Sequence, residues 1–95
     1  HRKYYPHGIG HWLGMDVHDA GLYFIKGEPR AIEEGMCFTI EPGLYVPGND
    51  TQAPAQYRGI GVRIEDNIVI NASGCENMTV DVPKEIADIE ALMKG

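Results

Sequence analysis

The sequence predicts an α+β protein made mostly of antiparallel strands, with one helix at its C-terminal end. Two observations carry this prediction. Two segments in the middle of the chain alternate apolar and polar residues with the period of a strand, and the C-terminal segment "PKEIADIEALMKG" repeats apolar residues at helical spacing. We find no internal repeat and no linker, so we expect one structural unit. At 95 residues, it can bury only a modest core.

The first segment, "HGIGHWLGMDVHD", covers residues 7–19 and contains three histidines and two aspartates. Helix-breaking residues exclude a helix here: Pro6, Gly8, Gly10 and Gly14. We therefore expect a loop that leads into a strand at residues 13–17, where apolar residues predominate. Residues 21–34 contain glycine, proline and several charges, which indicates an exposed connection with one turn of helix.

The next segment, "GMCFTIEPG", has the alternation of a half-buried strand. Met36, Phe38 and Ile40 are expected to face the core, and Glu41 is expected to face the other side. The Pro-Gly pair that follows Glu41 cannot continue a regular strand, so the chain should turn or bulge directly after this glutamate.

A second strand is predicted in "GIGVRIEDNIVI", after a segment at residues 47–57 whose composition is typical of a loop. Arg63 and Glu65 alternate with apolar residues and should share one face of this strand. The Asp-Asn pair at residues 66–67 favours a hairpin turn. At the C-terminal end, apolar residues at helical spacing predict a helix, with Pro83 and Glu85 near its start and Gly95 beyond its end.

Charge and hydropathy narrow the classes of function. The chain has 14 acidic and 8 basic residues and a net charge of -6, which argues against nucleic acid or an anionic membrane as a partner. No apolar stretch approaches the roughly 18 residues of a transmembrane helix, so we expect no membrane association and a cytoplasmic location. Cys37 and Cys75 are too few for a disulfide scaffold and are predicted to be reduced structural thiols.

The polar residues of these segments could form a metal site. Each predicted strand presents one glutamate on its polar face, Glu41 or Glu65, and the loop before them presents His11. Carboxylates and an imidazole held on strands suit a hard or borderline divalent ion. Each residue also has a structural interpretation, as a hydrogen-bonded histidine or a solvated glutamate. Residue types and spacing alone leave both interpretations open.

The segments "HGIGHWLGMDVHD", "EEGMCFTIEPGLYVP", "YRGIGVRIEDNIVI" and "DIEALM" resemble, in this order, the aminopeptidase P and prolidase family of metallopeptidases. This family shares the pita-bread fold with methionine aminopeptidase and creatinase. The resemblance covers nearly the whole chain and implies the C-terminal portion of a pita-bread fold. The short loop before "QYRGIGVRIED" is more similar to aminopeptidase P than to prolidase.

The resemblance implies a dinuclear metal centre, usually with two Mn²⁺ ions, whose ligands in this chain are His11, Glu41 and Glu65. Glu65 would bridge both ions, and Glu41 would also move a proton from the attacking water to the leaving nitrogen. His18 would donate a hydrogen bond to the substrate carbonyl or the tetrahedral intermediate. His7 would line the substrate site, and Arg63 would hold a ligating carboxylate in place.

The implied reaction is hydrolysis of the N-terminal Xaa-Pro bond of a peptide with proline in its second position, by a water that the metal ions activate. Two further aspartate ligands of the family lie upstream and have no counterpart here. We therefore interpret residues 1–95 as the C-terminal segment of a catalytic domain that is inactive alone and homo-oligomeric when full length. Two alternatives remain: a relative that cleaves another bond, such as the Xaa-Pro dipeptidase prolidase, and a non-catalytic peptide-binding module.

Overall fold

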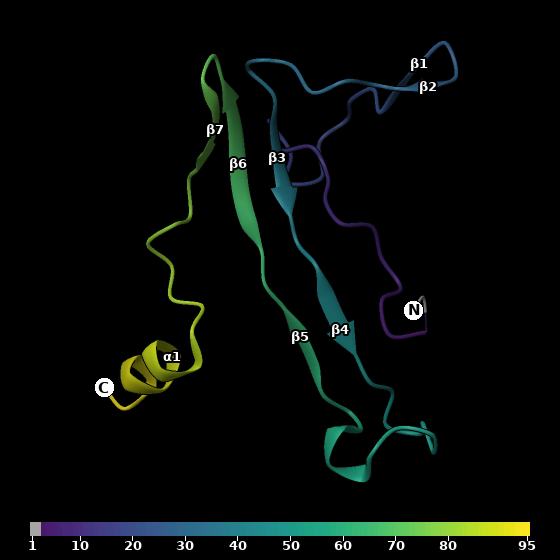
Figure 1. The fold of residues 1–95 in the computed structure, drawn as a ribbon, viewed down its shortest axis with the longest axis vertical. Coiled ribbons are helices and arrows are strands. Elements are labelled where there is room, and N and C mark those ends of the chain that lie inside the picture. Colours follow the sequence, from purple (N-terminus) through teal and green to yellow (C-terminus); the bar gives the residue numbers. More distant parts are fainter. Residues whose placement is uncertain (1–2) are drawn as a thin grey trace.

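A long two-stranded antiparallel ribbon forms the centre of the fold in this computed structural model, which describes residues 3–95 (Figure 1). One side of the ribbon consists of β3 (Cys37–Ile40) and β4 (Gly43–Tyr45), and the other consists of β5 (Gly61–Arg63) and β6 (Asp66–Asn71). Ile40 lies opposite Asp66 and Gly43 lies opposite Arg63. Two residues separate the strands on each side, so both halves of the ribbon keep one register.

The ribbon is interrupted at Pro42, which has no backbone N–H to donate across it. Ile64 still donates its own N–H to the Pro42 carbonyl, at 3.1 Å, so the two sides stay together through the interruption. The turn or bulge predicted directly after Glu41 is therefore wrong, because the chain continues through Pro42 in one register and only the regular hydrogen-bond ladder is interrupted. This interruption lies where Glu41 and Glu65 are opposite each other.

The histidine-containing segment runs antiparallel to β3 and β4 as an irregular edge strand. Thr39 donates its N–H to the His11 carbonyl at 2.9 Å, and Tyr45 donates its N–H to the Tyr4 carbonyl at 2.8 Å. The glycines of this segment do not prevent the pairing, because extended backbone needs only hydrogen-bond partners. At Gly10, the absence of a side chain lets the two backbones approach closely, because a Cβ there would collide with the Thr39 carbonyl.

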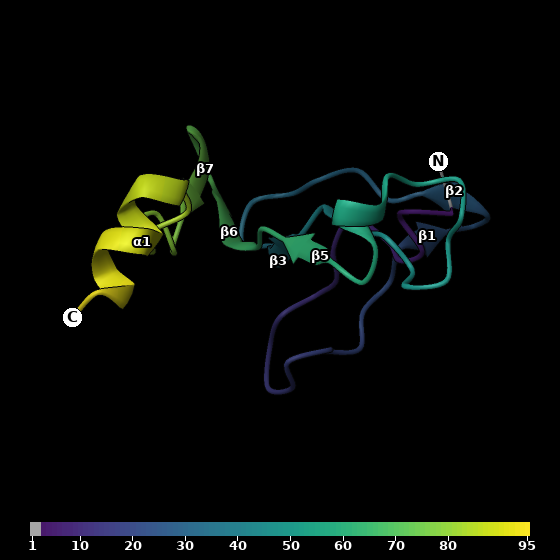
Figure 2. The same cartoon turned by 90° about the horizontal axis from the view of Figure 1, so that it is seen from below.

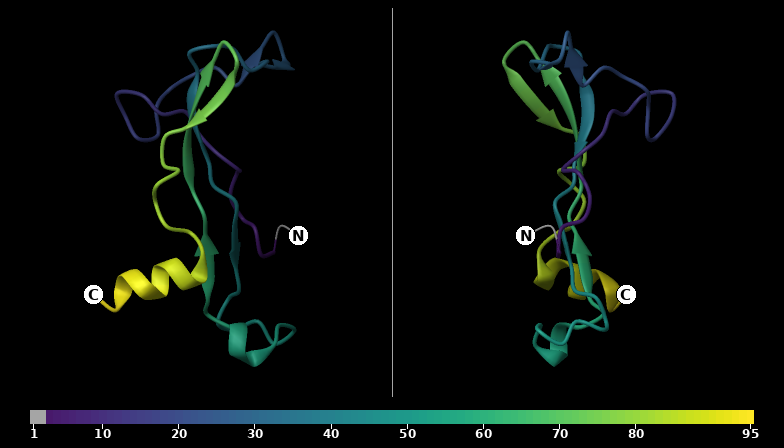
Figure 3. Two further views of the ribbon diagram at one scale, coloured as in Figure 1. Left: turned by 60° about the vertical axis from the view of Figure 1, so that its left-hand side comes forward. Right: turned by 90° about the vertical axis from the view of Figure 1, so that its right-hand side faces the viewer.

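The strand predicted at residues 13–17 is wrong. The extended pairing ends at Leu13, and the backbone then bends into a loop that the N–H of Asp19 closes on the Trp12 carbonyl at 3.1 Å. Figures 2 and 3 show this loop standing away from the sheet. A Cβ on Gly14 would collide with the Asp19 carboxylate, so a larger residue at position 14 would require that side chain to move.

A charged cluster holds the start of the edge strand against the loop at residues 47–57. Asp50 accepts hydrogen bonds from the Tyr4 hydroxyl at 2.7 Å and from Lys3 Nζ at 3.0 Å. These two bonds, the one from Tyr4 first, lower the pKa of Asp50 to about 2. The 47–57 segment is a loop as predicted, except for one turn of 3₁₀ helix, η1 (Ala55–Tyr57).

Two further sequence-based predictions fail locally. Residues 21–34 contain a small hairpin of β1 (Phe24–Ile25) and β2 (Glu28–Pro29) instead of a helical turn. Its two turn residues, Lys26 and Gly27, have φ angles of 51° and 80°, as a tight hairpin turn requires. Residues 66–67 do not form a turn, because β6 begins there and pairs with β3; the turn lies at residues 72–73, before β7 (Gly74–Asn77).

The predicted C-terminal helix is confirmed as α1 (Ile86–Met93). It lies to one side of the ribbon (Figure 1), and its apolar residues are exposed, as at Leu92, which is 67% exposed. In the described part of the chain, no helix combines the length and hydropathy needed to cross a membrane.

The fold has little core of its own. Its radius of gyration is 16.9 Å, whereas a compact chain of this length would have about 12 Å. The predicted burial of the apolar face is confirmed at Met36, which is 9% exposed, but not at Ile40, which is 37% exposed, whereas Thr39 and Glu41 on the other face are 1% and 7% exposed. Cys37 and Cys75 are free as predicted, but Cys75 is exposed and packs in no core. The best buried surface is thus the polar face that carries Glu41.

Candidate metal centre

Two carboxylates face each other at the interruption of the ribbon. The register places Glu41 opposite Glu65, on the same face of the sheet. Glu41 is buried, and the side chain of Glu65 is 39% exposed. Like charges directly opposite each other in a sheet are unfavourable, and more so when one of them is removed from water. The pair therefore needs positive charge close by.

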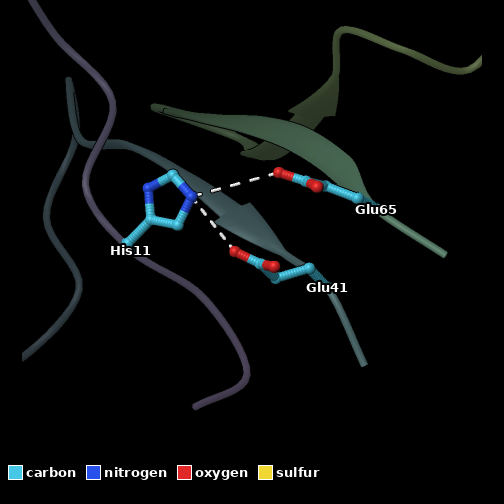
Figure 4. Close-up of side chains that lie close together, drawn as sticks. All are labelled: His11, Glu41 and Glu65. Atoms are coloured by element: carbon cyan, nitrogen blue, oxygen red, sulfur yellow. Dashed lines mark ion pairs between the residues drawn. The ribbon is translucent and has the colours of Figure 1, made fainter. Parts of the chain in front are cut away.

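His11 completes a group of three ligand atoms, drawn in Figure 4. Its Nε2 lies 3.1 Å from Glu41 Oε1 and 4.0 Å from Glu65 Oε1. The potential ligand atoms of these three residues all lie within 4.8 Å of one another. His11 comes from the edge strand, while the two glutamates come from opposite sides of the ribbon. Thus three separate stretches of chain supply the group.

The tautomer of His11 fits a metal ion. Its Nδ1 lies 2.9 Å from the Trp12 carbonyl, which can only accept a hydrogen bond, so Nδ1 carries the proton. In the neutral ring, Nε2 then presents a lone pair to two carboxylates. Three electron-pair donors that converge in this way repel one another unless a metal cation or a proton on Nε2 lies between them. An imidazole and two carboxylates also match the ligand preferences of Mn²⁺ and related divalent ions.

Arg63 supplies positive charge from the other side of Glu41. It lies opposite Gly43, so its diagonal neighbours on the same face are Glu41 and Tyr45. Its Nε lies 3.4 Å from Glu41 Oε2 and donates a hydrogen bond to the Tyr45 hydroxyl at 2.8 Å. The pKa of Arg63 is raised above its ordinary value, mainly by this hydrogen bond to Tyr45. Arg63 therefore stays charged beside Glu41.

Tyr45 connects Arg63 to His7. His7 Nδ1 lies 2.7 Å from the Gly8 carbonyl and so carries a proton, which leaves Nε2 of the neutral ring to accept a hydrogen bond from the Tyr45 hydroxyl at 2.8 Å. The ring of Tyr45 folds back over Gly43 and Gly61; a Cβ at either glycine would come within 2.6 Å of it. The small residues therefore leave the space that this connection needs.

His18 is brought beside His11 by the closed loop at residues 12–19. The two imidazole rings lie 4.3 Å apart, centroid to centroid, and meet edge to face. His7, His11, His18, Glu41 and Arg63 line one cleft of about 280 Å³ together with Gly8 and Gly10. The cleft lies on the face of the sheet where the three ligand atoms converge.

The structure thus brings together all six residues that the sequence singled out: His7, His11, His18, Glu41, Arg63 and Glu65. Sequence reasoning missed two others. Thr39 donates a hydrogen bond to Glu41 Oε1, and Tyr45 joins Arg63 to His7. Both lie an even number of residues from Glu41, so the strand alternation could have placed them on its face.

Residues 1–72 match metallopeptidase family M24. The chain belongs to this family. The Xaa-Pro aminopeptidase of Haemophilus influenzae is 54% identical over 93 residues, which are 98% of this chain and 21% of that protein. The chain therefore spans about a fifth of the length of the relatives that it matches. These matches confirm the resemblance on which the six residues were selected.

Solved structures confirm the fold. The aminopeptidase PepP of Pseudomonas aeruginosa superposes with a TM-score of 0.92 at 53% identity, over 98% of this chain and 21% of that one. An Escherichia coli aminopeptidase P with the inhibitor Pro-Leu gives 0.88 at 52% identity, over 99% of this chain and 21% of that one. The M24 chain described here is thus, as predicted, an α+β portion of a pita-bread fold with antiparallel strands and a C-terminal helix.

Proposed function

We propose that this chain supplies part of the active site of a metal-dependent Xaa-Pro aminopeptidase, which hydrolyses the N-terminal Xaa-Pro bond of a peptide. The observation that carries the proposal is the convergence of His11, Glu41 and Glu65 within 4.8 Å in a chain of a metallopeptidase family. The Xaa-Pro aminopeptidases among its relatives support a substrate with proline in its second position, and the inhibitor Pro-Leu bound by an Escherichia coli aminopeptidase P supports a peptide ligand.

Three side chains would hold the metal: His11 through Nε2, and Glu41 and Glu65 through their carboxylates. Glu65 is the more exposed glutamate, and its carboxylate would offer both oxygens to the metal, which we propose to be two Mn²⁺ ions. Such ions would lower the pKa of a water and polarise the substrate carbonyl. Three ligands are too few for two ions, so we propose that the remaining carboxylates belong to other parts of a larger catalytic unit.

The other residues of the cleft act on the substrate and on Glu41. Glu41 accepts the proton of the attacking water on a carboxylate oxygen and returns it to the leaving nitrogen. His18 donates a hydrogen bond to the oxygen of the substrate carbonyl, where negative charge develops. His7, held by Tyr45, lines the substrate site. Arg63 keeps the Glu41 carboxylate from turning away, because its Nε lies 3.4 Å from Oε2.

A larger catalytic unit also agrees with the many exposed apolar side chains and the radius of gyration of 16.9 Å. Within such a unit, residues 1–95 would be the C-terminal segment of the catalytic domain. The cytoplasmic location and the homo-oligomeric state of the full-length protein remain predictions, which fractionation of cells and light scattering can check.

The proposal is tested with the full-length protein and two substrates, an Xaa-Pro-Xaa tripeptide and an Xaa-Pro dipeptide. We expect cleavage of the tripeptide after its first residue, loss of activity after treatment with a chelator, and recovery when Mn²⁺ is added. Preference for the dipeptide would identify a prolidase instead. Metal binding without cleavage of either substrate would identify a non-catalytic module.

His18→Ala in the full-length protein should lower kcat by about 10²–10³-fold and leave the metal content unchanged, because a donor to a developing oxyanion acts in the transition state. His18→Gln, which keeps an N–H donor, should recover part of the activity. The measurements are steady-state kinetics and metal analysis of the same preparations. Loss of metal in proportion to the loss of activity would show that His18 is a ligand and not a hydrogen-bond donor.

A further inference from the structure

Thr39 lies between two of the three metal-ligating residues. It is 1% exposed and belongs to β3, two residues before Glu41 and on the same face of the strand. It also lies beside His11, whose carbonyl accepts the Thr39 N–H across the edge of the sheet at 2.9 Å. β-branching restricts the χ1 rotamers of this buried side chain, and its two hydrogen bonds give the hydroxyl a defined position.

The hydroxyl group of Thr39 makes two hydrogen bonds whose directions are determined. It accepts one from the backbone N–H of His11 at 3.0 Å, because an N–H can only donate. It donates its single proton to Glu41 Oε1 at 3.1 Å. One buried hydroxyl thus joins the backbone of one ligand residue to the carboxylate oxygen of another.

The oxygen that receives this proton is also the oxygen that faces His11. Glu41 Oε1 lies 3.1 Å from His11 Nε2, and Oε2 lies 3.4 Å from Arg63 Nε. Both carboxylate oxygens therefore have a partner on the protein, and rotation of the carboxylate would break one contact or the other. Each oxygen has more than one lone pair, so Oε1 can accept from Thr39 and still bind an ion.

We propose that Thr39 is a positioning residue, which holds Glu41 Oε1 and His11 Nε2 at the separation that a divalent ion requires. This inference rests on the proposed function and adds to it a residue that contacts neither metal nor substrate. Polar groups that orient metal ligands contribute about 10–100-fold to metal affinity or activity. The effect of Thr39 should appear first in metal affinity, because its partners are the carboxylate of one ligand residue and the backbone of another.

The test is a titration of the metal-free full-length protein with Co²⁺, followed by the visible absorption of the bound ion. Thr39→Val replaces the hydroxyl by a methyl group and should weaken Co²⁺ binding by about 10–100-fold and change the spectrum. Thr39→Ser keeps the hydroxyl and should restore both. If Thr39→Val does not fold, Thr39→Ala and Thr39→Ser differ by the hydroxyl alone and give the same comparison.

Thr79 provides a matched control. Its hydroxyl also accepts a backbone N–H, from Asn67 at 3.2 Å, and donates to a carboxylate, Asp66 Oδ1, at 2.6 Å. Thr79→Val should lower the melting temperature while Co²⁺ binds as in the wild type. If Thr39→Val also lost only stability and kept wild-type affinity and spectrum, the inference would be overturned and the proposed function would stand. A wild-type protein that bound no Co²⁺ would overturn both.

Discussion

Glu41→Gln in the full-length protein should reduce kcat/KM by about 10²–10⁴-fold, the usual contribution of a general acid-base group, and leave the fold intact. The change preserves volume but removes the negative charge. It also removes one carboxylate oxygen: an amide can present its oxygen to the Thr39 hydroxyl or to the Arg63 guanidinium, but its NH₂ group must then face the other group. Kinetics on an Xaa-Pro-Xaa tripeptide and circular dichroism measure the two expectations.

Glu33→Gln is the matched control, since Glu33 also pairs with an arginine but its side chain is 60% exposed and lies outside the cleft. Exposed ion pairs contribute little, so this variant should keep the activity and stability of the wild type. If Glu41→Gln retained more than about a tenth of the wild-type activity, Glu41 would not be the general base that we propose.

The 95-residue chain by itself should bind Mn²⁺ weakly and hydrolyse no Xaa-Pro peptide, an all-or-none difference from the full-length protein. Among its described residues, 3–95, one imidazole and two carboxylates converge within 4.8 Å, and these are too few ligands for two ions. Its exposed apolar side chains and unpaired strand edges should also make it self-associate. Metal binding, peptide hydrolysis and light scattering on the purified chain measure these three properties.

Refolding this chain with the rest of the full-length protein and Mn²⁺ should restore hydrolysis. The control is the same mixture prepared with Glu65→Ala, which lacks one carboxylate of the centre and should stay inactive. If the purified chain alone hydrolysed an Xaa-Pro bond, and Glu65→Ala abolished that hydrolysis, the site would not be divided between two parts of the protein.

Short-range patterns predicted those parts of the fold that depend on neighbouring residues. The apolar spacing at residues 86–93 suffices to predict α1, because a helix repeats its environment along one stretch of chain. The alternation in "GMCFTIEPG" likewise predicts β3 and places Glu41 on the face opposite Ile40. The strand assigned to residues 13–17 failed, because pairing with β3 ends at Leu13 and composition does not show where a partner strand stops.

Pro42 shows the limit of pattern reasoning for the site. The Pro-Gly pair predicts an irregularity in the strand. It does not predict that Glu65 lies opposite Glu41 at this point, because that arrangement results from the pairing of β3 with β6 and of β4 with β5. The turn assigned to residues 66–67 was wrong for the same reason, because those residues pair with β3 instead of turning. Register is a long-range property, which only the assembled sheet can define.

Residue identity was enough to predict the types of ligand, because metal chemistry restricts which side chains can bind. It also revealed the resemblance on which His11, Glu41 and Glu65 were selected. Their separation, the tautomer of His11 and the hydrogen bonds of Thr39 and Tyr45 could not be predicted in this way. These depend on distances between three stretches of chain that lie far apart in sequence. Only the paired edge strand and ribbon bring the ligand atoms of those stretches to within 4.8 Å of one another on one face of the sheet (Figure 4).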